Sequence, residues 1–414
     1  MKEQLKIDFD KVIKNLKPSK KDIELRKKNL NQFIENGFPN KRIEDWKFSD
    51  LNQIISSNIK ELKFFNNETK TNKFNKSILI SNFDHNKIIF VNGLISKIDF
   101  NYEEKSKIEI IDTHEAEDFN SKNSLVSLNN AFKFHYIKLT IKENYSLNKP
   151  LIIYNVTNNK LKSNTINQRV DFILKKNSSI KLINLFDDNS TNNFININYQ
   201  FKIEKDAILK NYIVDHKLNS NIRYFFNNIN LKHNSIAETF IFSVGSKFIK
   251  NEINCNLNDQ YSSAFINGII NLTDDQHHEI KTNINHLAEN TKSYQLIKSV
   301  LNDSSKGVYQ GKIFVNSKAQ KTDGYQLSKA LLLNENTEFD AKPELEIYAD
   351  DVKCSHGSTS GNLDEDVIFY LMSRGLNYQQ SKKLLINGFL LDVVQKITDL
   401  EIQDLIKNIM EIKQ

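Results

Sequence analysis

The sequence contains few cysteines, and this indicates the kind of cellular compartment in which the protein works. Only two residues, Cys255 and Cys354, are cysteines in a chain of 414. One disulfide could use both, but such sparse usage fits a reducing compartment better than an oxidising one. We therefore expect a protein of the cytoplasm.

Long apolar runs and strong local charge are also missing. No run of about 18 apolar residues occurs, which argues against a membrane span. Residues 1–6 lack the apolar stretch of a signal peptide. The net charge of +6 is spread thinly, and lysines alternate with Asp and Glu along the whole chain. We expect a mixed-charge surface that binds neither membrane nor nucleic acid.

Two catalytic motifs are absent. Gly307 and Gly311-Lys312 are spaced one residue short of a phosphate-binding loop, and Ile313 stands where that loop needs a hydroxyl. The apolar residues that follow predict a strand where that motif needs a helix. No Gly-x-Ser-x-Gly elbow occurs, so a hydrolytic nucleophile has no anchor. We therefore expect no ATP site, no catalytic residue and no enzyme.

The run His277-His278-Glu279 is a candidate metal site because it contains three possible ligands. Neighbouring residues on a strand point to opposite faces, so the two histidines cannot jointly hold one metal without a bend. A solvated turn is the favoured interpretation.

The N-terminal part predicts helices. Ser19 and Asp22 form a capping-box-like start, and Gly37 followed by proline ends the element. The only tryptophan, Trp46, is expected to be a packing anchor rather than a binding residue. The polar residues 66–76 are interpreted as a linker.

From about residue 77 to 361 the pattern changes to strands. Short runs rich in Ile, Val, Phe and Tyr recur without helical patterns between them, which excludes a doubly wound sheet. Glycine-containing hairpin signals are scarce, which weakens the meander and propeller alternatives. A stacked β-solenoid remains, although no clean repeat period supports it.

The C-terminal part predicts three helices. The first is capped by residues 362–365, the second has a capping box of Asn377 and Gln380, and residues 398–401 cap the third. The apolar positions expected to face inward are Val367, Ile368, Leu371, Leu384, Leu385, Phe389, Val393, Ile397, Ile402, Leu405, Ile406 and Ile409.

The most informative pair of residues is Cys354 and His356. On an extended backbone they lie on one face, with Cα atoms roughly 7 Å apart. A thiolate and an imidazole together suit zinc, copper or iron–sulfur chemistry, but two ligands complete no such site. On spacing alone we favour a buried cysteine beside a hydrogen-bonded histidine. The alternative is a site completed by ligands of a partner chain.

Several segments around this pair resemble the SufB/SufD family of the Suf system. They are residues 321–326, 331–333, 343–357 and 369–375, within a dense resemblance over about 291–397. Residues 44–47 match weakly, and the middle of the chain does not align clearly.

Within that family the chain resembles the SufD branch. SufB-like chains generally carry His-Glu-Ala where this chain has Cys354 to Gly357, and a cysteine before the preceding strand, where this chain has Ser328-Lys329-Ala330-Leu331. Ser360 departs from the usual small apolar residue, with little expected effect.

The resemblance implies a mainly β fold in three parts. These are an N-terminal helical domain (1–76), a right-handed parallel β-helix core (77–361) and a C-terminal helical domain (362–414). It also implies a non-catalytic scaffold for iron–sulfur cluster assembly that pairs with SufB through the β-helix cores. Because an open β-helix end carries unpaired backbone groups, we expect the chain alone either to form a homodimer or to expose an aggregation-prone edge. The SufC ATPase, which hydrolyses ATP, would dock on the C-terminal helices, and the residues we assign to that region are Phe369, Tyr370, Arg374, Leu385 and Phe389.

The resemblance also implies roles for the pair. His356 would lie at the SufB interface with Cys354 close by, and both are candidate ligands of iron or of a transient iron–sulfur cluster held there. One alternative is a SufB-like subunit that holds the cluster through its own cysteines. The other is a β-helix enzyme acting on polysaccharides, which would need an acidic groove and a secretion signal.

Overall fold

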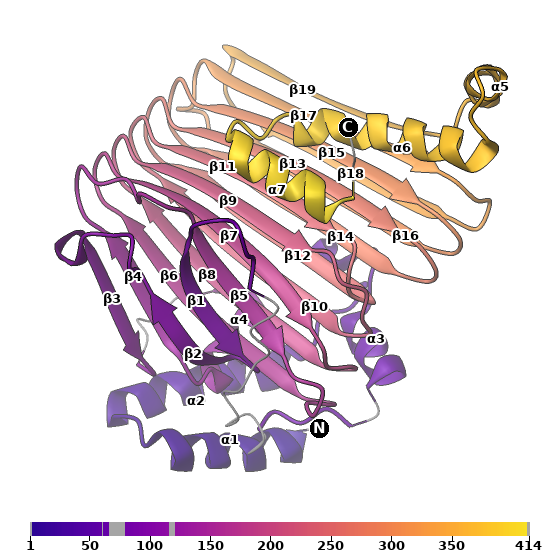
Figure 1. Ribbon diagram of the computed structural model, residues 1–414. Helices are drawn as coiled ribbons and strands as arrows, with labels where there is room; N and C mark the ends of the chain where they lie inside the picture. The colour runs from indigo at the N-terminus through magenta and orange to yellow at the C-terminus, as the bar shows by residue number, and fades with distance from the viewer. Residues whose placement is uncertain (1, 60, 66–78, 116–120, 412–414) are drawn as a thin grey trace.

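The computed structural model describes residues 2–59, 61–65, 79–115 and 121–411 (Figure 1). The helices are α1 (Lys2–Leu16), α2 (Lys20–Asn36), η1 (Glu44–Trp46), α3 (Leu51–Asn58), η4 (Lys105–Lys107), α4 (Ser124–Phe132), α5 (Glu365–Ser373), α6 (Tyr378–Val394) and α7 (Leu400–Ile409). The first strands are β1 (Asn86–Val91), β2 (Leu94–Asp99), β3 (Ile108–Thr113), β4 (Tyr136–Ile141), β5 (Leu151–Thr157), β6 (Thr165–Leu174), β7 (Ser179–Asp188), β8 (Phe194–Ile203), β9 (Ile208–Asp215) and β10 (Ile222–Leu231). The remaining strands are β11 (Ile236–Ser243), β12 (Phe248–Leu257), β13 (Ser263–Leu272), β14 (His277–His286), β15 (Lys292–Leu301), β16 (Lys306–Val315), β17 (Thr322–Leu332), β18 (Glu338–Ile347) and β19 (Val352–Gly361).

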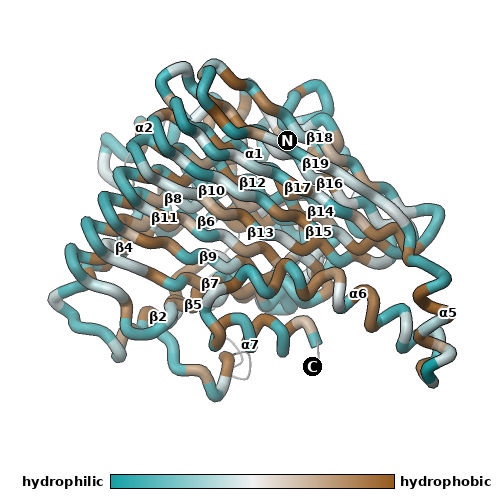
Figure 2. The backbone as a smooth tube through the Cα atoms, turned by 90° about the horizontal axis from the view of Figure 1, so that it is seen from above, coloured by the Kyte–Doolittle hydropathy of each residue, from teal (hydrophilic) through white to brown (hydrophobic). Residues whose placement is uncertain are grey.

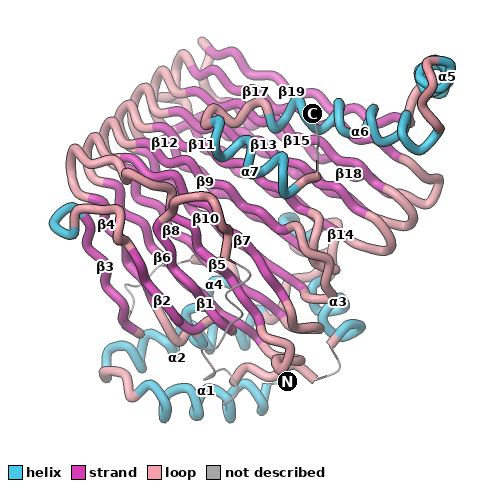
Figure 3. The backbone as a smooth tube through the Cα atoms, viewed as in Figure 1, coloured by secondary structure: helices cyan, strands magenta, loops and turns pink. Residues whose placement is uncertain are grey.

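Successive strands alternate between two sheets that face each other (Figure 3). From β5 onward the odd-numbered strands pair in parallel in a ten-stranded sheet, and from β4 onward the even-numbered strands do so in a nine-stranded sheet. Each pair of consecutive strands is therefore one turn of a solenoid. This confirms the mainly β fold with a parallel β-helix core.

The turns of the solenoid differ in length, which hides the repeat in the sequence. Along the nine-stranded sheet, the partners Phe194, Ile222, Phe248, His277 and Lys306 are 28, 26, 29 and 29 residues apart. The next partner of Lys306, Glu338, is 32 residues further on. No fixed period exists for a repeat search to find.

The bends between strands use asparagine where glycine is the usual choice. Asn144, Asn177 and Asn234 all have left-handed backbones, with φ of 55°, 54° and 52°. Asparagine tolerates this conformation because its short side chain bonds locally. Asn177 Nδ2 donates to Asn144 Oδ1 at 3.0 Å, so equivalent bends also stack on one another. The low glycine content is thus compatible with many tight bends.

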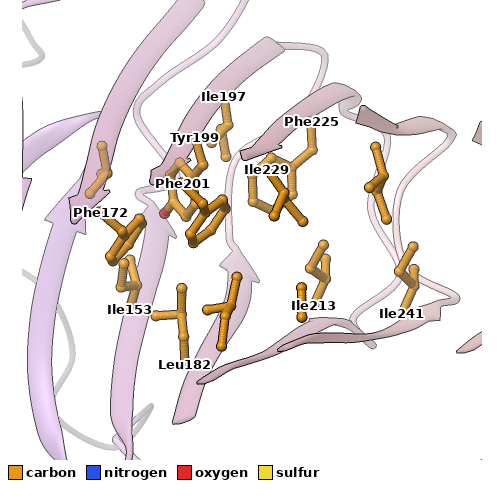
Figure 4. Close-up of a cluster of buried hydrophobic side chains, with 14 of the residues drawn as sticks. Ile153, Phe172, Leu182, Ile197, Tyr199, Phe201, Ile213, Phe225, Ile229 and Ile241 are labelled. Atoms are coloured by element: carbon orange, nitrogen blue, oxygen red, sulfur yellow. The ribbon is translucent and has the colours of Figure 1, made fainter. Parts of the chain in front are cut away.

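The interior of the solenoid is a column of buried aliphatic and aromatic side chains (Figure 4). Phe172 and Phe201 stack with ring centroids 4.8 Å apart, and Tyr199 packs edge-on against Phe225 at 4.9 Å. Truncating a buried phenylalanine of this kind typically costs about 3–5 kcal/mol. The column holds the two sheets together.

The two groups of helices cover opposite sheets. α1 to α3 pack together with α4 on the outer face of the nine-stranded sheet, through residues such as Phe194 and Tyr224. Trp46 is buried there, with its ring centroid 5.8 Å from that of Tyr224, which confirms its packing role. α6 and α7 lie on the outer face of the ten-stranded sheet (Figure 2), where Val393 and Ile402 are buried. No helix in the described ranges is long and apolar enough to cross a membrane.

The predicted helix caps are largely confirmed. Ser19 Oγ accepts from Asp22 N–H at 3.2 Å, and Asn377 and Gln380 form the reciprocal capping box. Asp399 caps α7, while the cap of α5 is Asp364, two residues after Asn362, the first residue of the expected capping segment 362–365. The predicted linker 66–76 lies outside the described residues.

Two apolar positions of the C-terminal helices were predicted wrongly. Leu384 on α6 and Val367 on α5 were expected to face inward, but they are 51% and 39% exposed. Only the part of α6 around Leu390, Val393 and Val394 is fully buried against the sheet, so the start of the helix keeps apolar side chains in solvent.

Two histidines inside the solenoid are neutral because they are buried. His278 Nδ1 lies 2.9 Å from Ser243 Oγ, and His286 Nδ1 lies 2.7 Å from Thr291 Oγ1. Burial is the main cause that lowers the pKa of His278 to about 3 and that of His286 to about 4. In an unfolded chain a histidine titrates near pH 6.5.

We expect the variant His286→Gln to resist acid better than the wild type. His286 binds a proton below about pH 6.5 in the unfolded chain but only below about pH 4 in the folded protein. Between pH 6.5 and 5 this difference lowers the free energy of unfolding by about 2 kcal/mol. Urea unfolding at pH 7 and pH 5 measures the change in each protein. Burial raises the pKa of Asp215 to about 6, which acts in the opposite direction, but Asp215 is common to both proteins and cancels. An equal pH dependence in both would contradict the prediction.

Candidate functional site

The two ends of the solenoid differ. At the N-terminal end, the edge strands β2 and β3 are six residues long and pair antiparallel with β1 and β4. At the other end, β19 pairs only with β17 and β18 only with β16. Both last strands therefore carry a free edge of backbone N–H and C=O groups, which makes this end a template for another strand.

Cys354 and His356 both point toward the interior at this open end. In the β17–β19 ladder Cys354 lies opposite Gly324, and His356 lies opposite Gln326, whose side chain is fully buried inside the solenoid. Register partners in a parallel pair share a face, so both side chains cover the last turn of the core. Cys354 is half-buried and His356 is exposed.

The interior becomes polar as it approaches this pair. Tyr309 Oη donates to Gln295 Oε1 at 3.1 Å and lies 3.4 Å from Gln326 Oε1. Gly311 makes room for this contact, because a Cβ there would lie 2.3 Å from Gln326 Oε1. Amides and hydroxyls thus replace the aliphatic column directly below His356.

The two cysteines have different environments. Burial raises the pKa of Cys255 to about 12, and this residue lies in the apolar interior on β12. Burial also raises the pKa of Cys354, with a smaller contribution from Asp323, while a backbone contact with Gly324 lowers it. In the isolated chain Cys354 is therefore mainly a neutral thiol and would need a metal or a cation beside it to become a good ligand. No group of three His, Cys, Asp or Glu side chains placed to hold a metal occurs among the residues whose placement is described.

Pro343 lies on the edge strand β18, where its missing N–H breaks no hydrogen bond. Glu338 N–H donates to Ser305 O at 3.0 Å and Tyr348 N–H donates to Val315 O at 2.9 Å. Even-numbered residues of β18 therefore direct their N–H groups to β16, and odd-numbered ones face the free edge. Proline is tolerated at such positions, and here it removes one donor from the free edge.

The expected solvated turn at His277 to Glu279 is wrong. These residues begin strand β14 between β12 and β16, and His278 and Glu279 are buried. His277 Nε2 lies 3.0 Å from Glu279 Oε1, on the face that the N-terminal helices cover. Glu279 also pairs with buried Lys250, and these neighbours hold the pKa of its carboxyl low against the effect of burial. His277 and Glu279 therefore belong to a structural cluster with Lys250, while His278 lies on the opposite face, inside the solenoid.

The segment that superficially resembled a phosphate loop is the strand β16. Gly307, Gly311 and Lys312 all lie within it, paired with β14 and β18. The two glycines leave room for neighbouring side chains inside the solenoid: Leu301 packs beside Gly307, and Gln326 packs beside Gly311.

The residues assigned to partner docking fall into two groups. Phe369 and Tyr370 are exposed on α5, with the Arg374 guanidinium 5.1 Å from the Tyr370 ring. Leu385 and Phe389 are half-buried on α6, and Phe389 packs toward the sheet under the Lys298 ammonium at 4.5 Å. Only the first group forms a free surface.

Sequence reasoning missed a buried ion cluster in the interior. Arg223 on β10 pairs with Asp188 and Asp215 at the ends of β7 and β9. The three residues are spaced along the chain without any local pattern, and only the stacking of turns brings them together.

Comparison with known proteins places these features in a family context. Residues 154–389 match the model of the family described as "SUF system FeS cluster assembly, SufBD core domain". The chain is 26% identical over 376 residues to the iron–sulfur cluster assembly protein SufD of Escherichia coli K12, covering 89% of this chain and 88% of that protein. Over 78 residues it is 41% identical to the chloroplastic protein ABCI7 of Arabidopsis thaliana, and over 67 residues it is 40% identical to SufD of Bacillus subtilis. These shorter matches cover 19% and 16% of this chain and 16% and 15% of those proteins.

Proposed function

Because this chain belongs to the SufBD core family and has a role in iron–sulfur cluster assembly, we propose that it is the non-catalytic scaffold subunit of SufD type. In this proposal it forms a one-to-one pair with a SufB subunit in the cytoplasm and forms a homodimer when SufB is absent. Both cysteines are free, which fits a reducing compartment.

The observation that carries the pairing proposal is the contrast between the two solenoid ends. Both ends have edge strands with one unpaired side, but β2 and β3 are antiparallel strands of six residues, whereas β18 and β19 are ten-residue strands that continue the parallel ladders and offer a longer template. The inward-facing residues Leu345, Ile347 and Val352 are only partly covered there. A second solenoid end would both pair with the free strands and cover these apolar side chains.

The same end carries the proposed site for the nascent cluster. His356 is exposed and offers an imidazole nitrogen that can bind iron or move a proton near neutral pH. Cys354 lies two residues away on the same face and can add a thiolate once a cation lowers its pKa. The pair supplies two ligands, so SufB would complete the set around the cluster, which is cargo rather than a resident cofactor.

For the ATPase partner, we propose that SufC docks on the C-terminal helices and performs all ATP hydrolysis. α5 supports this because it projects from the body (Figure 1; Figure 2) and exposes Phe369 and Tyr370. Exposed apolar surface of this kind is typical of a protein interface.

The pairing proposal is tested by a charge placed at the open end. Ile347, on β18, is 37% exposed, and the variant Ile347→Glu should abolish pairing with SufB because a buried unpaired carboxylate is costly. Co-expression with SufB, followed by size-exclusion chromatography with light scattering, measures the loss.

A matched control sits at the other end of the solenoid. Ile111, on β3, is 41% exposed, and Ile111→Glu should pair normally. Retained pairing in Ile347→Glu, or equal loss in both variants, would exclude the open end as the interface.

A further inference from the structure

A groove of about 600 Å³ lies on the outer face of the ten-stranded sheet. The odd-numbered strands from β9 to β17 form its floor, and the end of α6 with residues 396–398 forms one wall. This volume is in the range of small-molecule sites. The groove faces away from the solenoid interior, so it is separate from Cys354 and His356 and does not rest on the function proposed above.

One part of the groove is a row of aromatic rings. Phe265, Tyr294 and Tyr325 are register partners on three adjacent strands. The first two rings are stacked, with centroids 6.0 Å apart and planes inclined by 7°, and the third centroid is 6.5 Å further on. Tyr294 Oη donates to Asp323 at 2.5 Å, which fixes its ring. The row offers an ordered surface on which a planar ring can stack.

Another part of the groove carries excess positive charge. Lys298 and Lys329 are register partners, and Lys298 Nζ donates to Asp392 Oδ2 at 2.7 Å. Lys298 mainly, then Lys396 and Lys329, lower the pKa of Asp392, so the three ammonium groups surround one carboxylate. Lys329 and Lys396 have no ion pair of their own among the described residues.

The remaining acid in the groove does not cancel this charge. Glu238 Oε2 lies 3.4 Å from Lys210 Nζ, so its carboxylate is already paired. Asp323, which accepts from Tyr294, lies at the ring end of the groove, six residues before Lys329 on β17. The lysine end therefore keeps two ammonium charges more than carboxylates, and these can attract an anion.

The distance between the rings and the cations defines the ligand. Tyr294 and Lys298 are four residues apart on one strand, as are Tyr325 and Lys329, and four residues of strand span about 13 Å. We propose that this groove binds a nucleotide, whose base stacks on Tyr294 and Tyr325 and whose phosphates lie between Lys329 and Lys396. A nucleoside alone would miss the cations, and a phosphate alone would miss the rings.

The test uses the full chain, purified without any ATPase partner, and the fluorescent nucleotide N-methylanthraniloyl-ADP. We expect saturable binding that unlabelled ADP displaces and that adenosine or pyrophosphate alone displaces at least about tenfold less well. The double variant K329Q/K396Q should raise the Kd about tenfold. Tyr294→Ala combined with Tyr325→Ala should raise it about fivefold or more.

Two control variants separate the groove from its surroundings. Lys292→Gln removes one lysine charge on the outer face of β15, outside the groove lining, and Tyr261→Ala removes an exposed ring elsewhere. Both should bind like the wild type. Absence of saturable binding to the wild type, or equal affinity in the groove variants and the controls, would overturn the proposal.

Discussion

Replacing His356 with alanine should leave the protein folded and paired with SufB, yet stop clusters from forming on the assembled complex. The side chain is exposed at the end of the solenoid, so little packing is lost. We expect the iron content of the anaerobically purified complex to fall about tenfold or more. Removing even a group that only hydrogen-bonds to a metal ligand typically lowers metal affinity by about tenfold or more. Iron and acid-labile sulfide analysis measures the loss, and circular dichroism checks the fold.

The two cysteines provide graded controls for this experiment. Cys354→Ser should have a milder effect, because the raised pKa of Cys354 makes it the weaker ligand. Cys255→Ala should form clusters normally, since Cys255 is buried on β12. Normal iron and sulfide in the His356→Ala complex would reduce Cys354 and His356 to structural residues.

Structural features that depend on only a few neighbouring residues were predicted correctly from the sequence. The capping box of Asn377 and Gln380, the cap at Ser19 and the buried Trp46 all depend on neighbours within a few residues or on one large apolar side chain. The alternation of apolar and polar residues likewise predicted the strands of the core.

Features that depend on how the solenoid turns stack could not be predicted from local sequence patterns. From β4 onward, turn lengths between 26 and 33 residues and asparagine-rich bends hid the solenoid repeat. The run at His277 looked solvated because its partner Lys250 lies on the previous turn. The pairing of Cys354 and His356 on one inward face was predictable from period two, but the free edge beside them follows only from their place on the last strand.

The C-terminal helices divide into a part that holds the fold and a part that is free. α6 and α7 bury Leu390, Val393, Ile402 and Ile406 against the sheet. In α5, Ile368 is the buried residue, and the helix projects from the body (Figure 1). Deleting everything after residue 361 would uncover the apolar sheet face, so loss of partner binding by such a truncation would not separate docking from misfolding.

Point variants on α5 give the sharper result. Phe369 is 73% exposed, and the double variant F369A/Y370A should keep its melting temperature while losing most affinity for SufC. Aromatic residues at the centre of an interface typically contribute about 2 kcal/mol or more each, which is roughly 30-fold in Kd per residue. Isothermal titration calorimetry with purified SufC measures the change. The matched control is Leu400→Ala at the start of α7, where the side chain is 71% exposed but lies on a different helix, and it should bind SufC normally. If both variants bind equally well, SufC does not dock on α5.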